Sequence, residues 1–457
     1  MKRLLLGLPL LSALASPPVV AAQSGTADDD ALASVLDSVT MRNIGPFRSG
    51  AWVTSIAVPT APAREHLYTV YAAVRSGGLW KTTNSGVTWD PVTDSLGTIA
   101  SVGAVAVAPS DSRIVWIGGG DQANARSSMS GDGVFKSTDA GKTWKSMGLA
   151  DSHHIARIVL HPKNPDIVYV AAMGHLFSKN AERGVFRSKD GGVTWKKVLY
   201  INDGVGAIDL VINEKAPDQI FAAMYEKERL PWQIIESGPE SGVYRSDDGG
   251  DRWTRLTNGL PEGKIGRIGL DIYQRNPRVL YALLENQNLK PTASGESRAV
   301  NSTSPLAQGI YGNELYRTDD GGRSWRKVSG DVNVAGGKAP YSFNQLKINP
   351  FDDQQVVVTS DSMFQTKDGG KTWTMDFMRG TFGDFRCVWW DPQDQDRVMA
   401  RRDGGVSVSY DRGKTADWSP NMKVGEVYAI GVDMDDPYHV YAGLQDHESW
   451  KGPSNGP

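Results

Sequence analysis

An eight-residue phrase recurs along this chain and constrains its fold more than any other feature. Clear copies stand at residues 137–144 (Ser-Thr-Asp-Ala-Gly-Lys-Thr-Trp), 188–195 (Ser-Lys-Asp-Gly-Gly-Val-Thr-Trp) and 366–373 (Thr-Lys-Asp-Gly-Gly-Lys-Thr-Trp). Consecutive copies lie 43 to 72 residues apart, an interval that predicts one supersecondary unit copied many times. The third position of the successive copies is occupied by Asn84, Asp139, Asp190, Asp248, Asp320, Asp368 and Asp411.

The residue types of this phrase are those of a tight hairpin turn. Aspartate accepts hydrogen bonds from nearby backbone N–H groups, and glycine adopts a positive φ without a steric penalty. The threonine and tryptophan that close the phrase favour the start of a strand, where β-branched and aromatic side chains pack well. We therefore interpret the third position of each copy as a structural turn former; a ligand site at each aspartate is the alternative.

The segments around each copy predict the other strands of the unit. Apolar runs ending in proline come first, as at 102–109 and 155–162, and further runs follow, as at 166–171 and 184–188. Such runs separated by turn residues indicate antiparallel strands. The chain is therefore predicted to be an all-β β-propeller of four-stranded antiparallel blades. The seven full blades are expected near residues 52–93, 102–147, 155–199, 206–257, 265–329, 342–377 and 383–420.

Part of an eighth blade is predicted from what remains. Residues 425–433 and 439–443 have the pattern of its first two strands, a third strand is missing, and residues 39–46 are expected to supply its outer strand. Combining strands from both ends of a propeller removes an open sheet edge. The propeller domain is assigned to residues 39–457 and is expected to be C-terminally incomplete.

The N-terminus has the pattern of a secretory signal peptide at residues 1–22. Lys2 and Arg3 precede an apolar run, and small residues end at Ala22, where cleavage is expected. The apolar run is too short to span a bilayer, so no integral membrane segment is predicted. Residues 23–38 are polar and acidic and are expected to form a flexible linker. The mature protein is therefore expected to be secreted or periplasmic.

Composition excludes several classes of partner. The formal net charge is −3 and no basic block occurs, which argues against nucleic acid and anionic membranes. The single cysteine, Cys387, excludes an internal disulfide framework. No cofactor is predicted, and the oligomeric state is left open.

Loop lengths predict where a ligand binds. The loops between second and third strands are long in blades two to five, at about 118–132, 173–183, 225–241 and 285–313. These loops are expected on the face opposite the repeated phrase, and insertions on one face often mark a binding face. The candidate ligand-binding residues on that face are Arg75, Asp121, Arg126, His153, His154, His175, Glu182, Arg183, Arg229, Trp232, Asp384, Arg402 and Asp403.

Histidines and arginines are concentrated on the same face. His153, His154, His161 and His175 fall in blade three, and histidine both ligates metals and titrates near neutral pH. Their spacing matches no zinc motif, so no metal site is predicted; hydrogen bonding within the loops is expected, and His161 is assigned a structural role. Several arginines either converge on an anionic ligand or pair with nearby acidic residues. These are Arg42, Arg48, Arg75, Arg126, Arg157 and Arg183.

The repeated phrase is identified as an Asp-box, or BNR repeat. The chain resembles the families that carry it, which include sialidases, sortilin-type Vps10 domains and xyloglucan-cleaving glycoside hydrolases. Residues 41–46 (Met-Arg-Asn-Ile-Gly-Pro) do not match the sialidase Arg-Ile-Pro signature. The xyloglucan-cleaving enzymes place a catalytic aspartate before a Gly-Gly pair, and here Ser76 precedes Gly77 and Gly78. Glycoside cleavage needs two carboxyl groups, so neither catalytic pattern is matched.

Nearly the whole mature chain resembles bacterial secreted BNR-repeat proteins of the Vps10/sortilin-like family, which are often labelled glycosyl hydrolases. The resemblance rests on segments such as 42–46 (Arg-Asn-Ile-Gly-Pro), 154–162 (His-Ile-Ala-Arg-Ile-Val-Leu-His-Pro) and 437–446 (Pro-Tyr-His-Val-Tyr-Ala-Gly-Leu-Gln-Asp). Family members tend to have Gly-Asp-His-His where residues 383–386 are Gly-Asp-Phe-Arg, and Asn-Gly where residues 447–448 are His-Glu. If the family has a site that uses those residues, that site is expected to be weaker in this chain.

The sequence predicts an extracytoplasmic domain that recognises a peptide or glycan on the loop face opposite the Asp-boxes, with no catalytic residue assigned. The alternative is a glycoside hydrolase-like enzyme acting on a polysaccharide, with a carboxylate pair such as Asp121 and Glu182. A third hypothesis is a truncated paralogue without activity. Two carboxyl groups about 5–10 Å apart at the channel mouth would favour the enzyme, and a groove lined by arginine and aromatic residues would favour binding.

Overall fold

The computed structural model describes residue 35 and residues 43–456, apart from 47, 49, 98, 126, 292–308, 331–340 and 381–382. Residues 45–456 form one compact unit. The predicted signal peptide and, except for residue 35, the predicted linker lie outside the described residues. Within the described residues, no helix combines the length and apolar character needed to cross a membrane.

Strands make up almost all of the regular secondary structure in the described part of the chain, in antiparallel sheets that follow one another in sequence. The first sheet contains β1 (Val53–Ala57), β2 (Val70–Val74), β3 (Gly78–Thr82) and β4 (Asp90–Pro91). The second contains β5 (Val102–Ala108), β6 (Asp111–Gly119), β7 (Val134–Ser137) and β8 (Lys145–Ser146). The third contains β9 (Ile155–Leu160), β10 (Val168–Ala172), β11 (Gly184–Ser188) and β12 (Lys196–Leu199).

The next sheets repeat this order. The fourth contains β13 (Val205–Ile212), β14 (Ile220–Glu226), β17 (Gly242–Ser246) and β18 (Thr254–Leu256), with a small ribbon of β15 (Glu228–Arg229) and β16 (Ile234–Ile235). The fifth contains β19 (Ile265–Ile272), β20 (Leu280–Leu289), β21 (Ile310–Thr318) and β22 (Arg326–Lys327). The sixth contains β23 (Leu346–Asn349), β24 (Asp352–Thr359) and β25 (Met363–Thr366).

Two sheets and three short helices complete the description. The seventh sheet contains β26 (Phe385–Trp390), β27 (Val398–Arg402), β28 (Gly405–Ser409) and β29 (Asp417–Ser419). The last contains β30 (Val427–Val432), β31 (His439–Leu444) and β32 (Ser449–Pro453). The helices are α2 (Ala63–Tyr68) and the 3₁₀ turns η1 (Asp94–Leu96) and η2 (Ala150–Ser152).

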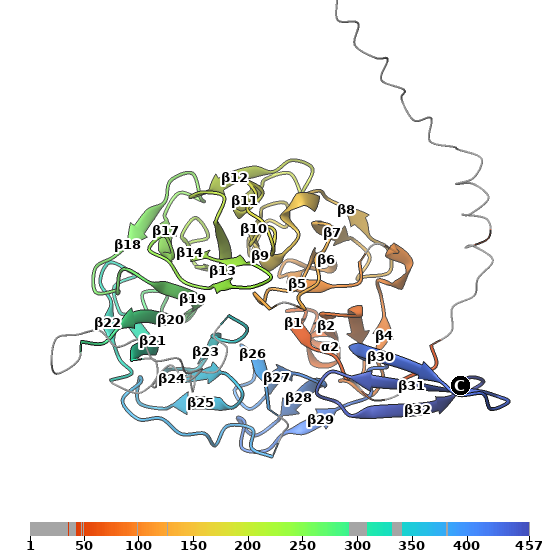
Figure 1. The fold of residues 1–457 in the computed structure, drawn as a ribbon. Helices are drawn as coiled ribbons and strands as arrows, with labels where there is room; N and C mark the ends of the chain where they lie inside the picture. Colours follow the sequence, from red (N-terminus) through yellow and green to blue (C-terminus); the bar gives the residue numbers. More distant parts are fainter. Residues whose placement is uncertain are drawn as a thin grey trace, which may run out of the picture. The chain divides into compact units, whose positions relative to one another are not determined.

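The sheets from β1–β4 to β26–β29 are arranged around a common centre, and the sheet of β30, β31 and β32 lies beside them (Figure 1). The first strand of each sheet contacts the first strand of the next, in the order β1, β5, β9, β13, β19, β23 and β26, and β26 in turn contacts β1. An antiparallel bridge between Trp52 and Asp403 adds to the contact between the first and seventh sheets. These contacts and the order of strands within the sheets confirm the predicted all-β propeller, which is built mainly from four-stranded antiparallel sheets.

Two details differ from the sequence prediction. The last sheet does have a third strand, because β32 pairs with β31 from His439↔Pro453 to Gly443↔Ser449, so the prediction that it is missing was wrong. Its glycine and proline suggested a turn, but proline is tolerated at the end of an edge strand. The sixth sheet has only a bridge, Gln365↔Thr374, where a fourth strand was expected.

The expected outer strand at residues 39–46 falls only partly within the described residues. Residues 43–46 are described and have no strand conformation, and residues 39–42 lie outside the description. Instead, Gly50 forms a parallel bridge with Gly425, which lies just before the first strand of the last sheet.

The repeated phrase forms the turn between the third and fourth strands. In the copy around Asp139, Oδ1 accepts hydrogen bonds from the backbone N–H groups of Lys142 and Thr143 at 3.0 and 2.8 Å, and Oδ2 accepts one from Thr143 Oγ1 at 2.6 Å. Gly141 donates its N–H to Ser137 Oγ at 2.8 Å and has a φ of 88°, which favours glycine. These bonds hold the hairpin closed. The Oδ1 atoms of Asn84, Asp190, Asp248, Asp320, Asp368 and Asp411 accept the corresponding backbone bond.

The tryptophans of the phrase tie neighbouring sheets together. Trp195 Nε1 donates a hydrogen bond to the backbone oxygen of Met147 at 2.7 Å, and its ring meets that of Trp116 edge-on with centroids 6.1 Å apart. A Cβ at Gly192 would lie 2.4 Å from the Trp116 ring, so only glycine fits there. The hydrophobic core therefore lies between successive sheets.

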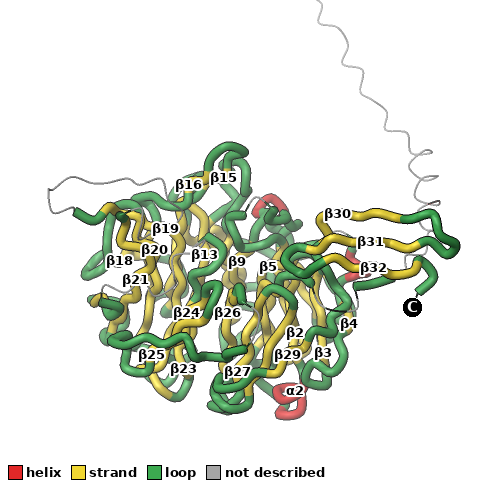
Figure 2. The backbone as a smooth tube through the Cα atoms, turned by 60° about the horizontal axis from the view of Figure 1, so that its bottom comes forward, coloured by secondary structure: helices red, strands yellow, loops and turns green. Residues whose placement is uncertain are grey.

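The two ends of the strands carry different connections. Figure 2 shows the ribbon of β15 and β16 at one end of the sheets and α2 at the other. Because each sheet is antiparallel, the turns after first and third strands share one end, and the loops after second and fourth strands share the opposite end. We call the latter the loop face; it is the end at which ligand binding is predicted.

Candidate functional site

Two arginines lie against the ring of Trp52 near the start of the first sheet. Trp52 stands directly before β1 and is 7 % exposed. The guanidinium carbon of Arg75, the residue after β2, is 4.0 Å from a ring centroid of Trp52, and that of Arg386 in β26 is 3.4 Å away. Attraction between a cation and an aromatic face is strongest where water is excluded. The indole thus stabilises positive charge from both the first and the seventh sheet.

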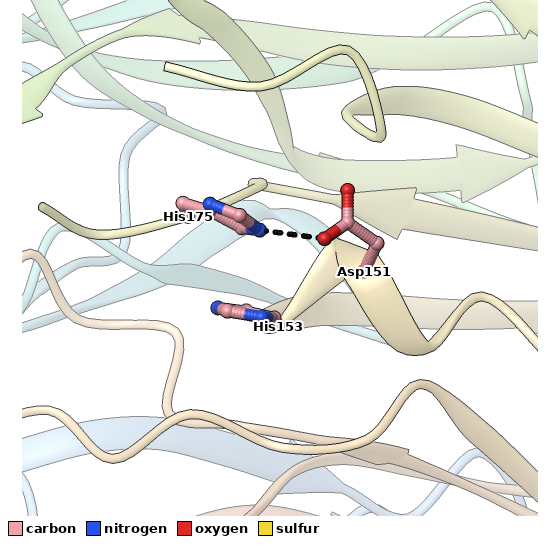
Figure 3. A group of neighbouring side chains, drawn as sticks. All are labelled: Asp151, His153 and His175. Atoms are coloured by element: carbon pink, nitrogen blue, oxygen red, sulfur yellow. Dashed lines mark hydrogen bonds and ion pairs between the residues drawn. The ribbon is translucent and has the colours of Figure 1, made fainter. Parts of the chain in front are cut away.

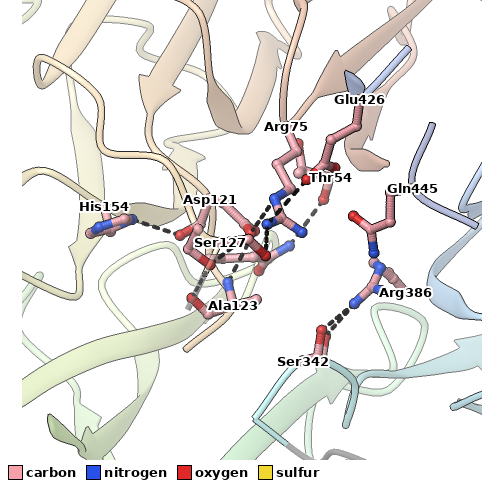
Figure 4. Close-up of polar contacts among 12 residues, drawn as sticks. Thr54, Arg75, Asp121, Ala123, Ser127, His154, Ser342, Arg386, Glu426 and Gln445 are labelled. Atoms are coloured by element: carbon pink, nitrogen blue, oxygen red, sulfur yellow. Dashed lines mark hydrogen bonds and ion pairs between the residues drawn. The ribbon is translucent and has the colours of Figure 1, made fainter. Parts of the chain in front are cut away.

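Arg75 also joins two buried carboxylates (Figure 4). Its Nε lies 3.3 Å from Asp121 Oδ2 and its Nη2 lies 3.5 Å from Glu426 Oε1. Asp121 accepts further hydrogen bonds from the backbone N–H of Ala123 and from Ser128 Oγ. Burial raises the pKa of Glu426, and the charge of Arg75 opposes that rise. These pairings matter because an unpaired buried charge is costly.

Three aspartates from separate elements meet on the loop face, and we call Asp384, Asp403 and Asp446 the carboxylate cluster. One carboxylate oxygen of each lies within 4.8 Å of the other two. Asp384 precedes β26, Asp403 follows β27, and Asp446 lies between β31 and β32. The φ angles of Asp384 and Asp446 are 64° and 52°, a left-handed conformation that aspartate adopts more readily than most residues.

Asp403 is the buried member of this cluster, with 1 % exposure. Its Oδ1 accepts a hydrogen bond from Arg386 Nε at 3.1 Å, whereas its Oδ2 has no hydrogen-bond partner among the described residues. Burial raises the pKa of Asp403 to about 7; Arg386 counteracts the rise, and the charges of Asp384 and Asp446 add to it. The carboxyl group can therefore hold or release a proton near neutral pH.

A second tryptophan, Trp418 in β29, contacts two more arginines. The guanidinium carbons of Arg48 and Arg402 each lie 4.5 Å from a Trp418 ring centroid. Burial lowers the pKa of Arg402 to about 10, and the nearby charge of Arg48 acts in the same direction. Arg402 directly precedes Asp403 in the chain. Arginine side chains thus lie against aromatic rings both at Trp52, beside the first sheet, and at Trp418, in the seventh sheet.

His154 connects this network to the third sheet. It directly precedes β9, is 2 % exposed, and its Nδ1 lies 2.8 Å from the backbone oxygen of Asp121. A carbonyl oxygen only accepts, so Nδ1 carries the proton in this contact. Burial lowers the pKa of His154 to about 3, and the charge of Lys227 contributes to the shift. The ring is therefore neutral near pH 7 and acts as a fixed hydrogen-bond donor.

Asp151, His153 and His175 form a second group on the loop face (Figure 3). Asp151 lies in η2, His153 follows it, and His175 lies in the loop after β10. One potential ligand atom of each lies within 4.8 Å of the others. The two imidazole rings stack with centroids 3.8 Å apart, and His175 Nε2 lies 3.0 Å from Asp151 Oδ1. The fold therefore brings together three residues whose sequence spacing indicated no metal motif.

Other predicted ligand-binding residues do not join either group. Glu182 pairs with Lys197 of the outer strand β12, with 3.4 Å between Oε1 and Nζ, whereas Asp121 pairs with Arg75. Trp232 is 80 % exposed between β15 and β16. Arg126 lies outside the described residues.

Arg183 and Arg229, also predicted to bind ligand, make contacts within the protein. Arg183 is 1 % exposed and donates hydrogen bonds to Asn180 Oδ1 at 3.1 Å and to the backbone oxygen of His175 at 3.2 Å. Burial lowers the pKa of Arg183 to about 10. Arg229 Nη1 donates to the backbone oxygen of Asn124 at 3.4 Å. Arg183 therefore holds its own loop in place.

Sequence reasoning missed Trp52, Glu426 and Asp446. Glu426 and Asp446 both lie beyond the seventh repeat: Glu426 falls in a segment interpreted only as a strand, and Asp446 ends the segment 437–446, which was cited only for the family resemblance. Trp52 lies outside the repeated phrase, at the start of the first strand. The one clue in the sequence was Glu426 itself, a carboxylate that directly precedes an apolar run. Its proximity to Arg75 depends on contact between the two ends of the folded chain.

A cavity of about 720 Å³ lies at the end of the sheets opposite the loop face. It is lined by Pro109, Pro162, Pro350 and Pro392, which follow the first strands of their sheets, and by Trp389. None of the described ligand-binding candidates lines this cavity. Two acidic residues, Glu214 and Asp271, also line it, and Asp271 pairs with Lys347 at 3.1 Å. Because none of the described sequence-predicted candidates lies there, the carboxylate cluster around the buried Asp403 is the stronger candidate for chemistry.

Comparisons with known proteins point to two related groups. The Sortilin-Vps10 family model, described as sortilin, neurotensin receptor 3, matches residues 77–238. A xyloglucanase from a Paenibacillus species is 23 % identical over 67 % of this chain and 30 % of its own length. A xyloglucanase from Hypocrea jecorina is 23 % identical over 66 % of this chain and 36 % of its own length. This chain thus spans about a third of the length of these relatives.

Solved structures show the same fold. An ancestral GH74 enzyme superposes with a TM-score of 0.61 at 18 % identity, covering 90 % of this chain and 54 % of that enzyme. A GH74 enzyme from Niastella koreensis gives a TM-score of 0.50 at 16 % identity, covering 88 % of this chain and 64 % of that enzyme. The chain is therefore a β-propeller similar to Sortilin-Vps10 proteins and to xyloglucanases.

Proposed function

We propose that this chain is a glycoside hydrolase-like propeller that acts on a polysaccharide at the carboxylate cluster. The observation that carries the proposal is Asp403, a buried carboxyl group with a pKa of about 7 beside Asp384 and Asp446. Glycoside cleavage needs one protonated and one ionised carboxyl group at the scissile bond. The similarity to xyloglucanases supports the same class of reaction.

Asp403 has the role of general acid in this proposal. Arg386 donates a hydrogen bond to Oδ1. The proton therefore resides on Oδ2, which has no hydrogen-bond partner among the described residues. From there it passes to the glycosidic oxygen as the bond to the leaving sugar breaks. A pKa near the working pH lets the same group accept a proton from water in a later step.

Asp446 has the role of the ionised partner because it is the exposed member of the cluster. Its closest approach to the other carboxylates, within 4.8 Å, is nearer to the separation of about 5–5.5 Å in retaining enzymes than to the larger separation in inverting enzymes. Asp446 therefore attacks the anomeric carbon and forms a glycosyl ester, which water then hydrolyses with Asp403 as base. The product keeps the anomeric configuration of the substrate.

The test is hydrolysis of soluble polysaccharides, with xyloglucan first, by the purified mature chain. Asp403→Asn should lower kcat by roughly 10²–10⁴-fold, the usual contribution of a general acid, and Asp446→Asn should abolish turnover. Asp417→Asn is the matched control, because Asp417 is exposed on β29 of the same sheet. Hydrolysis by Asp403→Asn at the wild-type rate would refute the assignment, and an α/β anomer ratio showing inversion would refute the role of Asp446.

A second candidate is binding of a peptide or glycan without turnover. It is favoured by the arginines held on Trp52 and Trp418, and by Ser76, which takes the place of the catalytic aspartate in the xyloglucanase pattern. In that case a glycan or peptide array would show ligands that depend on Arg75 or Arg386, while no substrate would be cleaved.

Architecture and location complete the proposal. We infer that seven sheets close the propeller, because the first strands contact one another in a cycle from β1 to β26 and back. The sheet of β30, β31 and β32 is then additional to this cycle. We also infer export through the signal peptide at residues 1–22, which N-terminal sequencing of the mature protein would test at Ala22.

A further inference from the structure

We propose that Asp151, His153 and His175 bind one divalent transition-metal cation of the zinc class. Two imidazole nitrogens and one carboxylate oxygen are donors that zinc, cobalt and nickel accept, whereas calcium and magnesium prefer oxygen alone. The side chains of Asp151 and His175 are 62 % and 22 % exposed, so water can complete the coordination. The site uses none of the residues of the carboxylate cluster, and the inference stands independently of the proposed hydrolysis.

The ligand atoms are already close to the required spacing. All three lie within 4.8 Å of one another, and His175 Nε2 is 3.0 Å from Asp151 Oδ1. In a tetrahedral site with metal–ligand bonds of about 2.0–2.1 Å, ligand atoms lie about 3.4 Å apart. Because the lone pair of an imidazole nitrogen lies in the ring plane, the two stacked rings must also turn out of their parallel arrangement for both nitrogens to bind one cation.

The outer contacts fix the ligands as they do in known metal sites. His175 Nδ1 lies 2.9 Å from Ser178 Oγ, which leaves Nε2 directed to Asp151. Asn180 donates from Nδ2 to the backbone oxygen of Asp151 at 2.9 Å and accepts at Oδ1 from the backbone N–H of His175 at 2.9 Å. A histidine ligand typically engages its second ring nitrogen in such a hydrogen bond, which sets its tautomer and orientation.

Two chain segments are held in register by these contacts before any metal binds. Arg183, which is buried, donates to Asn180 Oδ1 and to the backbone oxygen of His175. His153 has a φ of 55°, an uncommon conformation for a residue other than glycine, and this places its ring against that of His175. Because the backbone segments that carry the ligands are already positioned, only the side chains reorient when the cation binds, which limits the entropic cost.

The experiment is a titration of the full mature chain, without a polyhistidine tag, after removal of metal with EDTA. Zn²⁺ binding is followed by calorimetry, and Co²⁺ binding by its visible absorbance, which reports coordination by nitrogen and oxygen. The expected result is one equivalent bound at this group. His175→Gln and His153→Gln should each weaken binding by at least about 10-fold, and Ser178→Ala should weaken it about 10-fold through the outer contact.

The matched control is His439→Gln, because Asp433, Asp435 and His439 form another group of potential ligands on the last sheet. This variant should keep the site intact. Unchanged Zn²⁺ affinity and stoichiometry in both His175→Gln and His153→Gln would overturn the proposal, as would loss of binding in His439→Gln alone. The thermal unfolding temperature of each metal-free variant checks folding. If His175→Gln is destabilised, the Zn²⁺ affinity of His153→Gln is the deciding result. His153 contacts His175 by ring stacking, whereas His175 also makes hydrogen bonds to Ser178 and Asp151.

Discussion

At the scale of single residues, the loop face holds several charged groups that are removed from water. Arg75, Asp403 and Glu426 are each less than 5 % exposed, and each lies within reach of an opposite charge or an aromatic ring. Burial nevertheless dominates for the acids, so that the pKa of Asp403 rises to about 7. A group tuned in this way is suited to proton transfer and lowers the stability of the folded state when it is ionised.

The raised pKa of Asp403 predicts a specific dependence of stability on pH. The folded carboxyl titrates near pH 7 and the unfolded one near 3.8, so between these values only the folded chain keeps the proton. Its contribution to the free energy of unfolding is therefore complete below about pH 4 and is lost as pH rises towards 7, by about 1.4 kcal/mol per pH unit. Asp403→Asn, which resembles the protonated form, should lack this slope.

Urea unfolding of both proteins between pH 4 and 8 measures this difference. The free energy of the wild type relative to Asp403→Asn should fall as pH rises, and should level off above about pH 7. A relative stability that is constant or rises with pH would show that Arg386 keeps Asp403 ionised.

At the scale of elements, the hairpin turn of the repeated phrase is the unit that the sequence encodes most directly. The carboxylates of Asp190, Asp368 and Asp411 accept backbone and hydroxyl hydrogen bonds, which lower the pKa of each to about 2. All of these donors come from within the same phrase, and so local sequence is enough to specify the turn. The first copy keeps the backbone bond with an amide, since Asn84 Oδ1 accepts from Thr88 N at 2.9 Å.

The turn around Asp139 offers a direct test of this account. Asp139→Ala removes the acceptor for Lys142 and Thr143 and should lower the free energy of unfolding by about 1–2 kcal/mol. Asp139→Asn should cost less, because an amide oxygen accepts the backbone bond as it does at Asn84. Urea denaturation at pH 7 compares the variants. Equal stability of Asp139→Ala and the wild type would contradict a structural role for the carboxylate.

At the scale of the whole molecule, the last sheet supplies two acids to a site built mainly by other sheets. Glu426 directly precedes β30 and pairs with Arg75, and Asp446 between β31 and β32 joins the carboxylate cluster. Strand β30 is exposed along its full length. The hydrophobic clusters found in the described part of the chain contain no residue of β30, β31 or β32. We therefore expect the other sheets to fold without this one.

Removal of residues 425–457 should separate stability from function. The shortened chain should keep a cooperative thermal transition and a β-type circular dichroism spectrum, because its cores lie between the remaining sheets. It should lose polysaccharide hydrolysis, since Asp446 is absent. Comparison with the full chain carrying Asp446→Asn is the control for the missing carboxylate. Failure of the shortened chain to fold would show that the last sheet is part of the core.

The repeat allowed the sheets to be placed from sequence, but the carboxylate cluster was only partly foreseen. Asp384, Asp403 and Arg75 were singled out because they lie in loops of the predicted binding face. Their grouping with Asp446, and that of Asp151 with His175, follows from contacts between residues far apart in the chain. Glu182 and Trp232 satisfied the same loop criterion, but Glu182 pairs with Lys197 and Trp232 is exposed, because loop position does not fix the partners of a side chain.

The sequence by itself determined the turns, the strand order and the propeller class, since these depend on hydrogen bonds and apolar alternation within a few residues. Only the tertiary structure decided which ionisable groups meet and which of them titrate near neutral pH. Asp403 illustrates the reason. Its pKa is set by burial, by Arg386 and by Asp446, and each of these arises from packing between sheets that are distant in sequence.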